Sequence, residues 1–543
     1  MAQWNAPTQS FNNKDTNVPG RDDFIAYVQA DHYGDVAQWH PEFTSKNRLK
    51  VSESNTVFWT TYNRYPDTDV WATAVTANGI AYINNDATDP TTFDPASPGG
   101  NEILERSVVM RVETTGDKVV RQTQRIVPYF PGKAQQLSVA INLGGHIPGI
   151  TQKIGLFDGE NGCYFECAGD SHYHVAVLKN GVETVHANTE NWNGDRLNGN
   201  GKTGIQLDPT KQQLLVIDYE WYGAGSLHFG FVIHNELQRI HTVDNANEIL
   251  GLWSKSCNLP VRLELAALPT YGVYTASDIS ADAAANTIST AGAVNFSTVT
   301  GGNVTISGSA NIDGTYTVLS SNATTISIDG ATPITSDETA GASITVTEGL
   351  KYATLTHAST AVTTEGRVNE GGVLNTAMTG INYATNPPTV NMMLNNMPVG
   401  NNFYPILSIR MKSNALDAYV SPTNFQLWNH SNAHMTYAIV KNPTTLTGAT
   451  FTITDDDWVG AEIDEAANAV NFTADQIIFS GHIDKSDMPI QIPQDALIQL
   501  GRKFTNPGSP DFASLESDVY TIVAAAMPAN VSAYASITWL EQP

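Results

Sequence analysis

The stretch from Lys211 to Leu263 constrains the fold more than any other part of the chain. Two runs in it place an apolar side chain at every second position, namely Leu215, Ile217, Tyr219 and Trp221, and then Leu227, Phe229, Phe231 and Ile233. Gly223-Ala224-Gly225 between them allows a tight reversal, so the runs predict a hairpin with one apolar face. A second reversal at Asn235-Glu236 adds a third strand. Such a face needs a second sheet to cover it, which predicts a β-sandwich.

The composition extends this prediction to the whole chain. At 543 residues, 41% of them hydrophobic, the chain has room for about three to four domains with cores of their own. Charged residues make up 15%, well below the usual quarter or so, while Thr, Asn, Ala and Gly are abundant. This composition is typical of short strands and polar turns. We therefore predict an all-β protein of tandem β-sandwiches, jelly-roll-like or immunoglobulin-like.

The charge argues against several classes of partner. With 28 Lys and Arg against 54 Asp and Glu, the net charge is −26, and phosphate binding needs a basic face. No apolar run approaches the roughly 20 residues of a membrane span. The start, Met1 to Asn5, lacks the basic and apolar segments of a signal peptide. We expect no nucleic-acid binding, no membrane insertion, and synthesis in a cytoplasm.

The cysteines predict neither disulfides nor a metal centre. Cys163, Cys167 and Cys257 are too few and odd in number for a disulfide framework. Cys163 and Cys167 fall on one face of a predicted strand, but a zinc site would want four ligands. Buried thiols are the favoured interpretation, and no cofactor is expected.

Residues 1–104 are predicted to form an irregular, aromatic-rich attachment region. Aromatic rings dominate contact energy at interfaces, so this region can lie against another chain. The alternative is an irregular cap packed on its own sandwich. The candidate interface or glycan-stacking residues are Trp4, Trp39, Trp59 and Trp71, together with Trp192 from a later polar run.

Three groups of residues are candidates for chemical sites. Asp218 and Glu220 lie two apart on a strand with His228 across the hairpin, and a carboxylate pair can serve glycoside hydrolysis. His172 and His174 share a strand face, yet no carboxylate or third histidine is evident nearby to complete a metal site. Asp455-Asp456-Asp457 lacks the spaced ligands of a calcium loop. Solvated strand faces and a turn are the favoured interpretations, and no catalytic residue is assigned.

Ordered motifs carry a resemblance to a known family. They are Gly116-Asp117-Lys118-Val119-Val120-Arg121-Gln122-Thr123, Pro131-Gly132-Lys133, Gly155-Leu156-Phe157-Asp158 with Gly162, Trp192 with Asp195, Asn198-Gly199, Lys202 and Gly204-Ile205, Asp218-Tyr219-Glu220-Trp221 with Gly223 and Phe229-Gly230-Phe231, Pro405 to Ser413, Lys441-Asn442-Pro443-Thr444 and Val531 to Trp539. In these the chain resembles an uncharacterised family of virion structural proteins from tailed phages, cyanophages among them. The similarity covers about residues 105–270 and 351–543, which we expect to be the first and C-terminal sandwiches. It implies no enzymatic activity.

Residues 276–348 differ in kind from their surroundings. Short alternating strands with polar turns, and no Lys or Arg between Arg262 and Lys351, predict a compact β-module. Around Asn311 to Val318 and Ala340 to Val346 it resembles the small immunoglobulin-like modules that decorate phage proteins. Because the family pattern resumes beyond it, it is expected to be a small β-sandwich inserted in a loop.

The resemblance implies a protein of the virion, associated with the tail or baseplate as a fibre or fibre adaptor. Its expected partners are other virion proteins and copies of itself in a homo-oligomer, with a homotrimer as the expected form for a fibre. The alternatives are a module that recognises host cell-surface glycans for attachment, or a capsid decoration protein. A third hypothesis, ranked below these, is a polysaccharide depolymerase that acts through Asp218 and Glu220.

Overall fold

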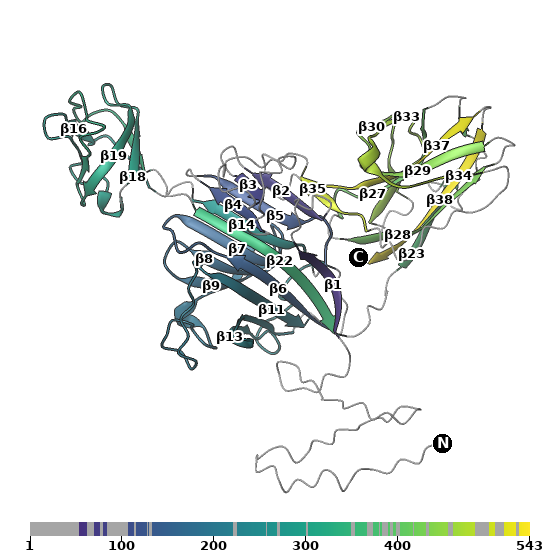
Figure 1. The fold of residues 1–543 in the computed structure, drawn as a ribbon, viewed down its shortest axis with the longest axis horizontal. Coiled ribbons are helices and arrows are strands. Elements are labelled where there is room, and N and C mark those ends of the chain that lie inside the picture. Colours follow the sequence, from purple (N-terminus) through teal and green to yellow (C-terminus); the bar gives the residue numbers. More distant parts are fainter. Residues whose placement is uncertain are drawn as a thin grey trace, which may run out of the picture. The chain divides into compact units, whose positions relative to one another are not determined.

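The computed structural model describes residues 54–542 apart from 62–69, 76–79, 84–106, 113–115, 128, 130–132, 221–224, 257, 269–271, 300–301, 349–352, 366–372, 380, 383–388, 391–394, 398–401, 416–417, 430–433, 454–459, 484–498, 505–514 and 528–530. Strands make up its regular structure, as Figure 1 shows. The helices of the described residues are single 3₁₀ turns, η2 (Thr189–Asn191), η3 (Phe296–Thr298) and η4 (Ala474–Gln476). The predicted all-β class is confirmed.

The first sandwich has one sheet built around the predicted hairpin. In hydrogen-bonded order its strands are β13 (Glu236–Val243), β12 (Leu227–Ile233), β11 (Gln212–Glu220), β6 (Ala134–Asn142), β22 (Ala353–Glu365), β4 (Val108–Val112) and β3 (Ile80–Ile83), with β1 (Ser54–Thr61) also on β22. Leu215 lies opposite Phe231 and Tyr219 opposite Leu227, as the two runs predicted. His234 and Asn235 adopt positive φ of 54° and 65° in the second reversal, a conformation that asparagine tolerates.

The other sheet of this sandwich consists of seven strands. They are β10 (Val182–Asn188), β9 (Tyr173–Lys179), β8 (Gly162–Ala168), β7 (Ile150–Phe157), β14 (Val261–Ala267), β5 (Lys118–Thr123) and β2 (Trp71–Val75). Apolar residues of both sheets form one buried core. Phe165 of β8 meets Phe231 of β12 edge to face, with ring centroids 5.1 Å apart. The second sheet that the hairpin required is therefore present.

The inserted module has a core that is separate from that of the sandwich. Its strands follow the order β15 (Val273–Ala276), β21 (Ile344–Glu348), β18 (Gly302–Ser307), β19 (Gly314–Ser321), β20 (Thr325–Ile328), β17 (Thr287–Ser289) and β16 (Ser280–Asp282). The first strand pairs antiparallel with the last, Val273 opposite Thr347. Both connections to the rest of the chain thus leave the module at the same end.

The C-terminal sandwich joins a four-stranded and a six-stranded sheet around a third core. The first contains β23 (Val373–Met378), β38 (Val531–Gln542), β26 (Asn395–Met397) and β28 (Tyr419–Asn429), and the second β31 (Thr452–Ile453), β32 (Ala461–Asp464), β27 (Tyr404–Met411), β37 (Val519–Met527), β29 (His434–Lys441) and β34 (Ile477–Ile483). Three short pairs accompany them: β24 (Ile381–Asn382) with β25 (Thr389–Val390), β30 (Thr445–Thr447) with β33 (Ala469–Asn471), and β35 (Arg502–Phe504) with β36 (Leu515–Ser517).

Two of the expected domain boundaries differ from the strand pairing. Within the expected attachment region 1–104, β2 pairs with β5 and β3 pairs with β4, so both belong to the first sandwich. Within the expected C-terminal region 351–543, β22 pairs with β4 and β6 of the first sandwich. The chain therefore returns to its first sandwich after the inserted module, which is the geometry of an insertion into one domain.

We expect residues 272–348 produced alone to fold, because the module's core is made by its own residues. Thermal unfolding followed by circular dichroism should show one cooperative transition. Substitution of Phe296, which is fully buried in this core, by alanine should lower its stability by about 3–5 kcal/mol. A spectrum without strand structure at low temperature would contradict the separate core.

Candidate functional site

The structure places two of the predicted stacking residues in the core. Trp71 and Trp192 are only 2% and 4% exposed. The indole Nε1 of Trp192 donates to the Ala187 carbonyl at 3.0 Å, and its ring stacks on Tyr173. Neither ring can lie against a sugar or another chain, so the prediction is wrong for these two. Trp4 and Trp39 lie outside the described residues, as does the side chain of Trp59.

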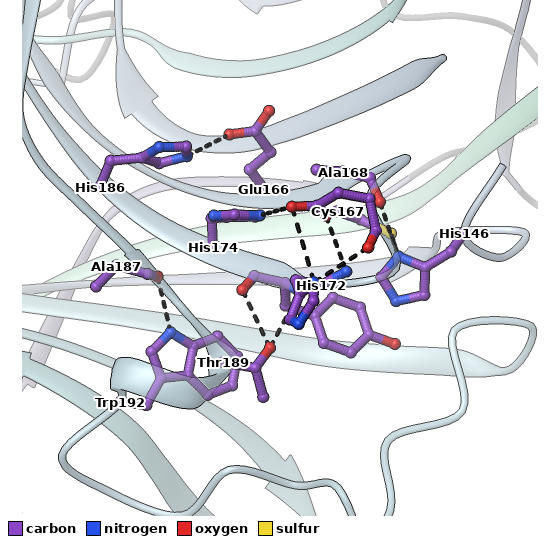
Figure 2. A network of polar contacts seen from close by, with 12 residues as sticks. His146, Glu166, Cys167, Ala168, His172, His174, His186, Ala187, Thr189 and Trp192 are labelled. Carbon is purple, nitrogen blue, oxygen red and sulfur yellow. Dashed lines mark hydrogen bonds and ion pairs between the residues drawn. The ribbon is translucent and has the colours of Figure 1, made fainter. Parts of the chain in front are cut away.

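A cluster of histidines and carboxylates lies on the outer face of the sheet β7 to β10 (Figure 2). The rings of His174 on β9 and His186 on β10 stack with centroids 4.5 Å apart and planes 19° apart. His174 Nε2 lies 3.0 Å from Asp170 Oδ2, and His186 Nε2 lies 3.2 Å from Glu166 Oε2. Each imidazole is thus held by a carboxylate of its own.

The structure brings a carboxylate and a third histidine close to His172 and His174. Asp170 stands two residues before His172 and accepts its backbone N–H at 2.9 Å, while the β9–β10 hairpin brings His186 onto His174. Within the described residues, no three His, Cys, Asp or Glu are arranged to hold a metal ion.

Asp170 and Glu183, two carboxylates of this cluster, stay ionised at neutral pH. Desolvation acts to raise the pKa of Asp170, but the His172 N–H and the His174 imidazole lower it below its usual value. Desolvation likewise acts to raise the pKa of Glu183, but the Tyr164 hydroxyl and the Lys153 ammonium lower it below its usual value. The cluster is therefore acidic in character, like the chain as a whole.

A tyrosine and a lysine extend the cluster across the sheet. The Tyr164 hydroxyl donates to Glu183 Oε1. Lys153 Nζ donates to the same hydroxyl at 3.0 Å, lies 3.3 Å from Glu183 Oε1, and sits 4.5 Å from the centre of the Tyr164 ring. Burial raises the pKa of Tyr164, so its hydroxyl remains a donor at neutral pH. These contacts tie β7, β8 and β10 together.

Cys167 lies beside His146, and a cysteine next to a histidine can serve as a catalytic nucleophile. Cys167 Sγ lies 3.4 Å from His146 Nδ1, which itself lies 2.9 Å from the Ala168 carbonyl oxygen. A nucleophilic cysteine needs a lowered pKa, whereas burial raises that of Cys167 and raises the pKa of Cys163 to about 12. Both are buried free thiols, as predicted. Cys257 lies outside the described residues.

The predicted alignment of Asp218 with His228 is confirmed, because these residues are directly opposite in the β11–β12 pair. Asp218 is half-buried, and His228 is buried with Nδ1 3.0 Å from Thr242 Oγ1. The side chain of Glu220 lies outside the described residues, as do Asp455 to Asp457. Of the two carboxylates on which the depolymerase hypothesis depends, the structure therefore describes the side chain of Asp218 alone.

A buried ion network crosses the same outer face further along the sheet. Glu264 receives Arg262 Nη2 at 2.8 Å and Lys118 Nζ at 2.8 Å, and Arg262 Nη1 donates to Gln122 Oε1 at 3.0 Å. Burial opposes ionisation of Glu264, but the charges of Arg262 and Lys118 prevail and lower its pKa to about 2. This network fastens β5 to β14 with charges that are satisfied within the sheet.

No helix in the described part of the chain is long and apolar enough to cross a membrane. No protein-family model and no curated protein matches the chain.

Solved structures with a similar arrangement of strands include enzymes that act on carbohydrates. A glycosyl hydrolase family protein from Mycobacterium fortuitum is 12% identical, covering 55% of this chain and 99% of its own, with a TM-score of 0.24. The β-glucanase of Bacillus licheniformis is 10% identical, covering 58% and 99%, with a TM-score of 0.25. A carbohydrate esterase from the Shiga toxin-encoding bacteriophage phi24B is 10% identical, covering 58% and 100%, with a TM-score of 0.23. At these scores and identities the likeness carries no argument about what this chain does.

Proposed function

We propose that this chain is a structural protein of a tailed-phage particle, associated with the tail or baseplate as a fibre or fibre adaptor. It works by contact with copies of itself and with neighbouring virion proteins, and catalyses no reaction. The resemblance of its ordered motifs to those of virion structural proteins supports a place in the particle. Its rigid β-sandwiches can present their surfaces to neighbouring proteins.

The observation that carries the proposal is the way in which the module is inserted. The module has its own core, and its first and last strands pair with each other, so it is held by both connections at one end. The strands on either side of it in sequence, β14 and β22, belong to the two sheets of one sandwich. A self-contained unit inserted in a sandwich suits a protein that displays surfaces, since insertions in loops cost little stability.

The charges of the first sandwich fit the same role. The Arg262, Glu264 and Lys118 network joins β5 to β14, and the Glu166–His186 pair joins β8 to β10 across β9. These groups stiffen the sheet by cross-strand contacts. These paired charges stabilise the sheet itself, so partners are recognised by other surfaces.

Mass spectrometry of purified particles of the phage that encodes this chain should find it as a particle component. Antibody labelling should place it at the tail end, and the copy number should be low relative to the major capsid protein. Lysate proteins of matched abundance provide the control for carry-over. Label over the whole head would favour a capsid decoration protein, and loss of the chain on gradient purification would sink the proposal.

A further inference from the structure

One end of the first sandwich presents apolar side chains to solvent. Of the eleven large hydrophobic residues that are exposed in the described part of the chain, four lie here. Val182, at the β9–β10 turn, is 62% exposed, Ile249 and Leu252 are 41% and 49% exposed, and Leu250 is fully exposed. Contiguous exposed apolar surface marks interaction sites more often than isolated residues do. We name this surface the tip: Val182, Ile249, Leu250 and Leu252, with the charged Glu160, Lys179, Glu248 and Lys255.

Hydrogen bonds hold the two segments of the tip together. Lys179 Nζ donates to the Leu252 carbonyl, and Lys255 Nζ donates to Asn180 Oδ1 at 2.5 Å. The side-chain oxygen of Asn161 accepts the backbone N–H groups of both Asn180 and Lys255, at 3.3 and 3.1 Å. The turn and the loop therefore form one surface.

The loop that carries three of the apolar residues is anchored at both ends. Asn245 is 3% exposed and its Nδ2 donates to the Gly225 carbonyl at 2.6 Å. Trp253 is also 3% exposed, and its ring meets that of Tyr219 edge to face at 6.3 Å. The two buried anchors thus hold Ile249, Leu250 and Leu252 in solvent. Exposing these apolar side chains to water costs free energy, and burial against a partner surface would recover it.

The charges of the tip select the partner. Copies of a chain with net charge −26 repel one another, but the tip carries Lys179 and Lys255 beside the exposed glutamates Glu160 and Glu248. A surface that carries apolar side chains together with charges of both signs can pair with a second copy of itself across a two-fold axis. We propose that the tip is a self-association surface that binds the tip of a second copy of this chain.

This inference deepens the proposed function. It rests on that function in one respect, namely that many copies of the chain come together in one particle. Four side chains on each partner give a contact at the small end of protein interfaces. Association of the isolated chain is therefore concentration-dependent, and the array of copies in a particle strengthens it.

The test is sedimentation equilibrium of the full chain over a range of concentrations, with Leu250→Ser/Leu252→Ser as the main variant. The wild type should form dimers, and the variant should dissociate at least about tenfold more readily, because two exposed leucines no longer become buried. The matched control is Leu319→Ser, which alters a 70% exposed leucine in the inserted module and should leave the dissociation constant unchanged.

A charge variant gives a second measurement. Lys255→Glu should weaken association, and Lys255→Glu with Glu248→Lys should restore part of it. A wild type that stays monomeric at every concentration, or a double serine variant that associates like the wild type, overturns the inference. Dimers of a chain that is missing from purified particles would instead sink the proposed function and leave the tip contact standing.

Discussion

Replacement of Phe231 by alanine should destabilise the first sandwich by about 3–5 kcal/mol. Phe231 is fully buried on β12 and meets Phe165 of β8 edge to face, so this pair joins the two sheets. Truncation removes the transferred apolar surface and leaves a cavity between layers that relax only in part. Hydrogen exchange in increasing urea, read peptide by peptide, should show β8 and β12 opening at lower urea than in the wild type.

The inserted module provides the internal control for this substitution. Its core shares no residue with that of the first sandwich, so its amides should exchange as in the wild type. The reciprocal variant, Phe296→Ala, should open the module and spare the sandwich. Equal loss of protection in both regions for either variant would show that the two cores unfold as one.

Replacement of Arg262 by methionine should cost the first sandwich about 3–5 kcal/mol at neutral pH, because it leaves a buried carboxylate short of its main counter-charge. Arg262 is 3% exposed, and after its loss Glu264 keeps Lys118 as its cation. Adding Glu264→Gln should recover most of the loss, since the buried charge is then gone. Chemical denaturation of the two variants beside the wild type measures both effects.

The pH dependence of that loss follows from the pKa of Glu264. Its folded pKa of about 2 lies below the ordinary 4.5, so the unfolded state binds the proton first as the pH falls. The ionised carboxylate contributes its full stability above about pH 4.5, and that contribution disappears between 4.5 and 2. The difference in the free energy of unfolding between wild type and Arg262→Met should therefore become smaller as the pH falls from 4.5 to 2. A gap that widens on acidification would contradict the ion network.

The local pattern of the sequence determined the hairpins correctly, because period-two alternation is a property of one strand. The β11–β12 register, with Asp218 opposite His228, follows from the alternation and the turn between the runs.

The histidine cluster could not be predicted, because it depends on a bulge. From the turn at Asn180-Gly181, Val182 lies opposite Lys179, and regular pairing would place His186 opposite Val175, facing the core. The structure has an irregularity between Glu183 and Val185 that shifts the register by one, so His186 lies opposite Ala176 and turns to the outer face beside His174. One extra residue in the strand thus creates the site.

Long-range pairing explains the errors in domain boundaries and in the tryptophans. β22 completes a sheet with β6, more than two hundred residues earlier in the chain, and no local pattern encodes that partner. Trp192 looks exposed within a run of Asn and Gly, yet its indole bonds to Ala187 and stacks on Tyr173. Composition reports the neighbours in sequence, whereas burial depends on the neighbours in space.

Electron cryo-microscopy of the intact particle tests the central claim, that this chain acts as a contact-forming component of the virion. The account predicts tail or baseplate density that fits the two sandwiches and the inserted module, each bounded by neighbouring copies or other virion proteins. Fully interpreted particle density in which no copy of the chain is found would contradict it.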